Sequence, residues 1–180
     1  ICHEHLEYYG LKQIKWMADR VGFKIVHVEF NRINGGSFSV TLAKKESHLK
    51  ENVKIVNRIL AKEIRIGMNS NKPIAAFHSR LKKSREGLLS FLNKTKREGK
   101  VVMGYGASTK GNVLLQYCNI TPKLIPFIGE VNKSKFGSFT PSTLIPIIDE
   151  KEVKKKNPHY LLVLPWHFRA VIIEKEKTYL

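Results

Sequence analysis

The sequence lacks any apolar run close to the roughly 20 residues that are needed to span a bilayer, although 42% of its residues are hydrophobic. No charged and then apolar segment of the secretory type opens it either. Its two cysteines, Cys2 and Cys118, are isolated and form no C-x-x-C pair, which favours a reducing compartment over a disulfide scaffold. We therefore expect a cytoplasmic protein without a membrane segment, large enough for one or two domains with a real core.

An initiator methionine is also missing: Ile1 leads directly into a dense motif, and we expect the chain to be a piece of a longer protein. Acidic residues are few, 15 against 32 lysines and arginines, so the net charge is +17. Such a charge invites a nucleic-acid partner, but no RNA-recognition, helix-turn-helix or zinc-finger signature accompanies it. A solvated lysine-rich surface is the better interpretation, and a basic nucleic-acid-binding module remains an alternative.

The most informative stretch that is present runs from Gly104 to Asn112, with the sequence GYGASTKGN, between a short apolar run and a helical pattern. A strand, a glycine-rich turn and a helix present backbone N–H groups and a helix N-terminus to a phosphate. Gly106 permits a tight turn, and Lys110 adds a positive charge. The stretch is not a Walker A motif, because Asn112 stands where lysine is required. It is also not a full dinucleotide fingerprint, because Thr109 replaces the third glycine.

Apolar periodicity divides the chain into three expected parts. Residues 1–45 contain a helix at 8–22 and two strands around a glycine turn, as in the end of a larger α/β domain. Residues 46–98 contain two helices, at 47–68 and 73–99, that form a hairpin connector. In residues 99–180 strands alternate with helices, which predicts a Rossmann-like parallel sheet. The elements expected there are strand 100–104, helix 110–118, strand 124–128, helix 150–156, strand 160–163 and helix 168–176.

Glu130 follows the second of these strands, at about the separation from the glycine loop where Rossmann folds place a ribose-binding carboxylate. This position raises the alternative of an NAD-dependent oxidoreductase that uses Gly104, Gly106, Gly111 and Glu130. The missing third glycine of the fingerprint counts against that alternative.

Three ionisable or metal-capable residue types stand together in Cys2-His3-Glu4-His5. Zinc binding is disfavoured, because adjacent side chains do not easily converge on one tetrahedral ion and the spacing is not H-E-x-x-H. A general base is the better functional interpretation, since an imidazole titrates near operating pH and a neighbouring carboxylate can orient it. A surface turn with incidental histidines is the remaining alternative.

Taken together, these motifs resemble those of the S-adenosylmethionine-dependent sugar C-methyltransferases, in the same order and over essentially the whole chain. The matching segments are residues 3–9, 35–37, 104–112, 135–137, 140–141, 145–147 and 164–169. The resemblance implies a zinc-binding segment and an S-adenosylmethionine site outside this chain. It implies that residues 1–45 are the C-terminal remnant, a helix and a β-hairpin, of the class I methyltransferase domain that carries this site. It also implies a C-terminal Rossmann-like domain that holds a nucleoside-diphosphate keto-sugar.

The resemblance assigns His5 as the base that forms an enolate, which attacks the methyl group of S-adenosylmethionine, with Glu4 as its partner. The residues that it places at the nucleotide-sugar are Gly104, Gly106, Ala107, Ser108, Lys110, Gly111, Asn112, Glu130, Lys135, Thr140 and His167. Cys2 departs from the family, whose members often carry tyrosine there; a thiol lacks the reach of a phenol, so substrate choice stays open. We expect no metal and no S-adenosylmethionine in this chain, and no activity from it alone.

Overall fold

The computed structural model describes residues 7–33 and 36–179, which divide into two compact units between Arg80 and Leu81, inside helix α3 (Lys72–Arg97). The predicted division at 45/46 and 98/99 stays a prediction. The motif with Cys2, Glu4 and His5 lies outside the described residues. Within the described ranges, no helix has the length and apolarity that crossing a membrane requires.

The unit before Leu81 is built on an antiparallel strand pair. Its elements are α1 (Leu11–Arg20), β1 (Phe23–Asn31), β2 (Ser37–Lys44), α2 (Val53–Arg65) and the first part of α3. Helix α1 lies within the predicted 8–22 but is shorter, and it ends before Gly22, whose φ of +78° is the left-handed conformation that glycine supplies at helix ends. β1 and β2 then pair along their whole length, from Phe23 opposite Lys44 onward.

A β-bulge at Val26 decides which face of β1 is buried. Ile25 and Val28 are both buried, although a spacing of three would place them on opposite faces of a regular strand. The register with β2 shifts between Ile25 and His27, and the extra residue returns Val28 to the buried face. The core of this unit consists of Leu11, Ile25, Val28, Val56 and Ile59.

Helix α2 begins at Val53, and the predicted start at Ser47 was wrong. The side chain of Asn52 accepts a hydrogen bond from the Ile55 amide at 3.1 Å, and the Asn52 amide donates to the Ile25 carbonyl at 2.9 Å. This side-chain cap sets the helix start, although apolar spacing continues upstream of it. Residues 66–71 lead from α2 into α3.

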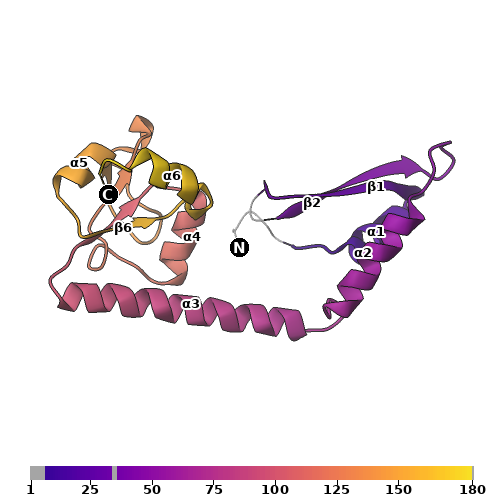
Figure 1. The fold of residues 1–180 in the computed structure, drawn as a ribbon, viewed down its shortest axis with the longest axis horizontal. Helices are drawn as coiled ribbons and strands as arrows, with labels where there is room; N and C mark the ends of the chain where they lie inside the picture. Colours follow the sequence, from indigo (N-terminus) through magenta and orange to yellow (C-terminus); the bar gives the residue numbers. More distant parts are fainter. Residues whose placement is uncertain (1–6, 34–35, 180) are drawn as a thin grey trace. The chain divides into compact units, whose positions relative to one another are not determined.

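The unit after Arg80 contains a four-stranded parallel sheet in the order β5-β4-β3-β6, which confirms the predicted Rossmann-like α/β fold. Its strands are β3 (Val102–Tyr105), β4 (Ile128–Glu130), β5 (Ile147–Asp149) and β6 (Tyr160–Val163). Its further helices are α4 (Thr109–Tyr117), α5 (Glu150–Lys155) and α6 (Arg169–Lys175), with short 3-10 turns η2 (Lys133–Lys135) and η3 (Trp166–Phe168). Figure 1 shows α4, α5 and α6 around this sheet.

The main core of this unit lies between the sheet and helices α3 and α4. Its fully buried members include Leu92 of α3, Leu115 of α4 and Ile128 of β4. Two strand predictions differ from the structure. β4 starts at Ile128 instead of Leu124, because the preceding residues turn, with the Ile125 amide bonded to the Thr121 carbonyl. β5 was not predicted; it is three residues long and directly follows Pro146.

Candidate functional site

The carboxyl edge of the parallel sheet has a topological switch point. The chain runs from β3 to its neighbour β4, outward to β5, and then back to β6 on the other side of β3. The order of the strands therefore reverses at β3, which has β4 on one side and β6 on the other. In open α/β sheets this is where a crevice for ligands forms. The glycine loop follows β3, and the segment from Leu164 to His167 follows β6, so both predicted binding segments meet this edge.

The glycines of this loop are required by close packing. A Cβ on Gly104 would lie 2.6 Å from Cγ1 of Ile128, and a Cβ on Gly111 would lie 2.6 Å from Cβ of Leu164. Gly106 has a φ of +81°, and a Cβ there would lie 2.7 Å from Cγ of Pro165. Strand, turn and helix thus approach β4 and the β6 connection at distances that only glycine allows.

A buried carboxylate ties the glycine loop to the loop after β4. Glu130, 7% exposed, accepts a hydrogen bond from the Ala107 amide at 2.9 Å with Oε2. Its Oε1 accepts from the amides of Val131 and Asn132 at 2.8 and 3.0 Å. Nζ of Lys135 lies 3.3 Å from Oε2 and donates to the Ala107 carbonyl at 2.7 Å. Glu130 and Lys135 therefore hold both polar groups of the Ala107 backbone.

These contacts also decide the charge of Glu130. Burial alone raises the pKa of a carboxyl group, but hydrogen bonds from the amides of Asn132 and Val131 and the nearby Lys135 ammonium outweigh it. The net effect is a Glu130 pKa below its ordinary value. The carboxylate is ionised at neutral pH, and four donors occupy the about four lone-pair positions that it offers.

The N-terminus of α4 completes the loop. Ser108 is the N-cap, and its hydroxyl accepts a hydrogen bond from the Gly111 amide at 3.1 Å. This cap leaves other first-turn amides without an intrahelical partner. Oδ1 of Asn112 is buried and has no hydrogen-bond partner among the described residues. The start of α4 therefore combines amide donors with one acceptor that a bound group could satisfy.

On the other side of the switch point, η3 exposes three aromatic rings. Trp166 is 58% exposed, and the His167 ring packs against Phe168 with centroids 4.2 Å apart. Pro165, which precedes them, lies so close to Gly106 that a Cβ atom at Gly106 would clash with its ring. The structure thus places His167 on the connection that packs directly beside the glycine loop.

A polar network that was not predicted from the sequence is centred on Tyr105, the last residue of β3 before the glycine loop. The Tyr105 hydroxyl is 2.7 Å from Oε2 of Glu150 and 2.6 Å from Oε1 of Glu176. Nζ of Lys154 pairs with Glu176 at 2.6 Å, and Nζ of Lys175 pairs with Glu150 at 2.8 Å. Burial, and then hydrogen bonds with Glu176 and Glu150, raise the pKa of the Tyr105 hydroxyl far above its usual value. The network fixes α5 and α6 to the end of β3.

Thr140 is not brought to the loop by any contact of the described residues. It is fully buried, and its hydroxyl accepts from the Ile145 amide at 2.8 Å and lies 2.7 Å from the Thr143 hydroxyl. It closes the turn before β5. Its predicted role at a ligand stays a prediction, as do those of Lys110 and His167.

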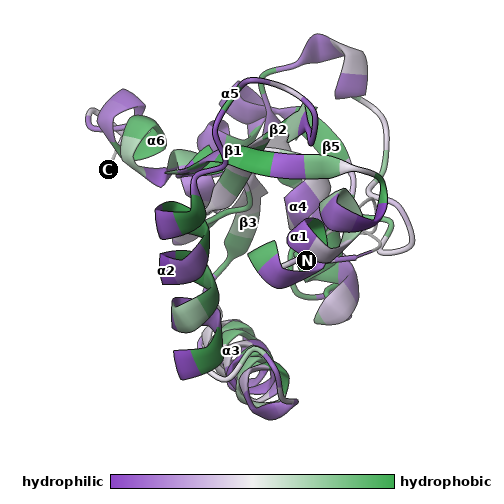
Figure 2. Ribbon diagram, turned by 90° about the vertical axis from the view of Figure 1, so that its right-hand side faces the viewer, coloured by the Kyte–Doolittle hydropathy of each residue, from purple (hydrophilic) through white to green (hydrophobic). Residues whose placement is uncertain are grey.

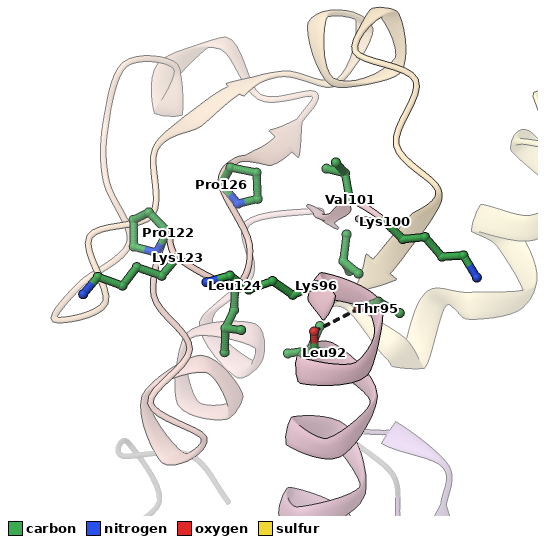
Figure 3. A pocket seen from close by; sticks show the side chains of 10 residues that line it. Leu92, Thr95, Lys96, Lys100, Val101, Pro122, Lys123, Leu124 and Pro126 are labelled. Carbon is green, nitrogen blue, oxygen red and sulfur yellow. Dashed lines mark hydrogen bonds between the residues drawn. The ribbon is translucent and has the colours of Figure 1, made fainter. Parts of the chain in front are cut away.

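A separate hollow of about 250 Å³ lies at the opposite, amino edge of the sheet. Leu92, Val102 and Leu124 form its apolar lining, and Figure 3 shows Lys96, Lys100 and Lys123 around it. Since its residues precede β3 and β4, it is not part of the carboxyl-edge site. Within residues 7–33 and 36–179, no three His, Cys, Asp or Glu side chains gather in a way that could hold a metal.

Comparison with known proteins agrees with this architecture. Residues 32–180 match the family model described as the C-methyltransferase C-terminal domain. Over 180 residues the chain is 30% identical to C-methyltransferase NovU of Streptomyces niveus, and it covers 43% of the length of that relative. The chain thus spans less than half of this curated protein, and it belongs to the C-methyltransferase family that is defined by this C-terminal domain.

Proposed function

We propose that the protein methylates a carbon atom of a nucleoside-diphosphate keto-sugar, and that the carboxyl edge of the parallel sheet holds the nucleotide. One observation carries this proposal. Glu130 and Lys135 hold the backbone of the glycine loop in place at the switch point, beside the start of α4. Family membership supports the methyl transfer. The nucleotide and the sugar are inferences from chemistry and from the resemblance.

The loop suits a diphosphate for a physical reason. Amides at a helix N-terminus and the positive end of the helix dipole favour phosphate oxygens. The Glu130 clamp fixes the loop before a ligand arrives, so less ordering entropy is lost on binding. No described residue donates to Oδ1 of Asn112, and a ribose hydroxyl or a base N–H supplies such a donor. Trp166 and His167 offer rings against which a base can stack.

In this proposal Glu130 positions the loop and does not bind ribose itself. Its oxygens already accept from Ala107, Val131, Asn132 and Lys135. A ribose diol donates to a carboxylate with free lone pairs, as in NAD-binding Rossmann folds. The same observation counts against the alternative of an NAD-dependent oxidoreductase.

The reacting groups come from the resemblance, because His5 and Glu4 lie outside the described residues. The imidazole of His5 takes a proton from the carbon beside the ketone, and the electron pair moves onto the ketone oxygen as an enolate. The carboxylate of Glu4 stabilises the imidazolium that forms. The enolate carbon is then the nucleophile, and anchoring the distant nucleotide keeps this carbon in place.

The glycine-loop site does not fit S-adenosylmethionine. Its sulfonium is a cation, whereas the charged side chains at the glycine loop are Lys110, Lys135 and a Glu130 that is fully hydrogen-bonded. The methyl donor, and the zinc ion that the resemblance implies, are therefore proposed to bind in parts of the protein that this chain does not span.

Calorimetric titration of the full-length protein with dTDP, GDP and UDP, with NAD as a control, tests the nucleotide site. We expect one nucleoside diphosphate to bind, and His167→Ala to weaken it by about tenfold, as expected for the loss of a ring on which a base stacks. His48→Ala, an exposed histidine of the other unit, is the matched control and should bind normally. A clear NAD signal without diphosphate binding would overturn the proposal in favour of the oxidoreductase.

A further inference from the structure

Helix α2 carries a row of positive charges that the described part of the chain does not compensate. Lys54, Arg58, Lys62 and Arg65 recur at intervals of three or four residues, so they share one side of the helix. Figure 2 shows hydrophobic and hydrophilic residues alternating along α2. The buried residues of its apolar side, Val56 and Ile59, belong to the core cluster that also contains Leu11, Ile25 and Val28. Among residues 7–33 and 36–179, no carboxylate lies within 4 Å of the heads of Arg58, Lys62 or Arg65.

The one acidic residue of α2 serves another purpose. The carboxylate of Glu63 accepts hydrogen bonds from the amides of Leu11 and Lys12, the first residues of α1. Glu63 thus caps α1. Its side chain lines a different hollow, together with Lys12, Leu60 and Met68. Glu63 is therefore not available to neutralise the positive row. Like charges one turn apart destabilise a helix by about 0.2–0.5 kcal/mol for each pair.

A hollow accompanies this row. It has a volume of about 620 Å³ and is lined by Phe30, Arg58, Ile59, Ala61, Lys62 and Arg65. All of its charged side chains are positive. The Phe30 ring is 59% exposed at one wall, with Nζ of Lys62 6.0 Å from its centroid and the Phe38 ring 5.9 Å away.

We propose that this hollow, the α2 groove, binds a small ligand that carries two adjacent phosphate groups. Guanidinium groups match phosphate oxygens with paired N–H donors, and a lysine between them adds a mobile charge. Arg58 and Arg65 are seven residues apart, or about 10 Å along a helix. A single phosphate engages one of these forks, whereas a diphosphate reaches both with Lys62 between them. The exposed face of Phe30 accommodates an apolar or planar group next to the phosphates.

The α2 groove lies in the unit before Leu81, so the inference does not depend on the proposed nucleotide site at the glycine loop. Its ligand is either inorganic pyrophosphate or a nucleoside diphosphate, and the ring of Phe30 distinguishes them. Pyrophosphate should bind the Phe30→Ala variant as well as it binds the unchanged protein. A nucleoside diphosphate that stacks on the ring should bind that variant more weakly.

The test is calorimetric titration of the full-length protein with inorganic pyrophosphate and with a nucleoside diphosphate. The groove variant is Arg58→Gln, Lys62→Gln, Arg65→Gln, and the charge-matched control is Lys72→Gln, Lys82→Gln, Lys83→Gln on exposed positions of α3. We expect pyrophosphate binding to fall by at least about tenfold in the groove variant and to be unchanged in the control. The groove variant removes repulsion within α2, so its thermal unfolding temperature should not fall.

Several outcomes would overturn the inference. One is that pyrophosphate does not bind the unchanged protein. Another is an equal loss of affinity in both variants, which is the behaviour of a diffuse +17 charge. Tight binding of a single-stranded oligonucleotide without pyrophosphate binding would instead identify a nucleic-acid surface. To separate the two sites, His167→Ala is titrated alongside. It should weaken only the glycine-loop site, so either proposal can fail while the other holds.

Discussion

Replacement of Glu130 by glutamine tests whether this carboxylate fixes the glycine loop. Glutamine has nearly the same shape but only one acceptor oxygen. If that oxygen stays on the amides of Val131 and Asn132, the new NH₂ group faces the Ala107 amide and the Lys135 ammonium. If the side-chain amide is turned round, Val131 and Asn132 lose their acceptor instead. In either arrangement two donors lose their partner.

The magnitude follows from the burial of those donors. Ala107 is 8% exposed, so water does not easily replace the lost acceptor. A hydrogen bond to a charged group contributes about 1.5–3 kcal/mol, and an unsatisfied buried donor costs about 1–3 kcal/mol. Lys135 is partly exposed and recovers a water partner, so its ion pair adds little. We expect Glu130→Gln to destabilise the loop locally by about 2–3 kcal/mol.

Hydrogen exchange at the Ala107 amide measures this effect directly, because it reports local opening without assuming that the whole chain unfolds in one step. A change of 2 kcal/mol corresponds to about 30-fold faster exchange. Glu152→Gln is the matched control, since Glu152 pairs only with Lys155 on the surface of α5 among the described residues. Unchanged exchange at Ala107 in Glu130→Gln would refute the role given to this carboxylate.

The same variant makes a pH prediction with a definite sign. The Glu130 pKa is lowered in the folded protein, so its contribution to stability is present above the ordinary glutamate pKa of about 4.3. That contribution is lost as the pH falls through the folded pKa. The difference in Ala107 exchange between the original protein and Glu130→Gln should therefore be full at neutral pH. It should shrink in acid below about pH 4.

Two further substitutions test the packing around the loop. Gly106→Ala adds a methyl group 2.7 Å from Pro165 at a positive φ, whereas Gly99→Ala meets only the positive φ of +69° in open space. Gly106→Ala should therefore lose about 1–3 kcal/mol more stability in urea unfolding, and equal losses would contradict the contact. Tyr105→Phe removes the hydroxyl between Glu150 and Glu176 and should cost about 1–3 kcal/mol. Unchanged urea unfolding would show that the network is not stabilising.

Much of the fold could be predicted, because the signals are local. Apolar spacing gave α1 and β6 closely, and the glycine turn after β3 was placed correctly. The start of α2 was missed because Asn52 caps the helix inside a longer apolar pattern. β5 was missed because a three-residue strand carries no periodicity of its own. Its hydrogen bonds depend on β4, whose paired residues come nineteen positions earlier in the chain, and only the fold brings the two together.

The structure brings predicted site residues together, while their roles at a ligand stay predictions. The glycine loop, Glu130 and Lys135 follow the ends of neighbouring parallel strands, and they meet at the carboxyl edge of the sheet. That Glu130 binds backbone amides could not be predicted, because an acidic residue at this position has the same sequence signal whether it holds ribose or a loop. The Tyr105 network joins β3, α5 and α6 across 71 residues of sequence, and no local pattern indicates it.

These roles determine which variants can report on ligand binding. Gly104, Gly106 and Gly111 are needed for packing, so their substitution cannot distinguish lost ligand contacts from a collapsed loop. Asn112 can make that distinction. Its Oδ1 is buried and has no hydrogen-bond partner among the described residues, so Asn112→Leu removes an unsatisfied acceptor and should leave thermal stability unchanged or raise it. If a ligand donates to this oxygen, nucleoside-diphosphate affinity should fall by about tenfold in calorimetry. A parallel loss of stability and affinity would show that Asn112 has a structural role, and unchanged affinity would exclude it from the site.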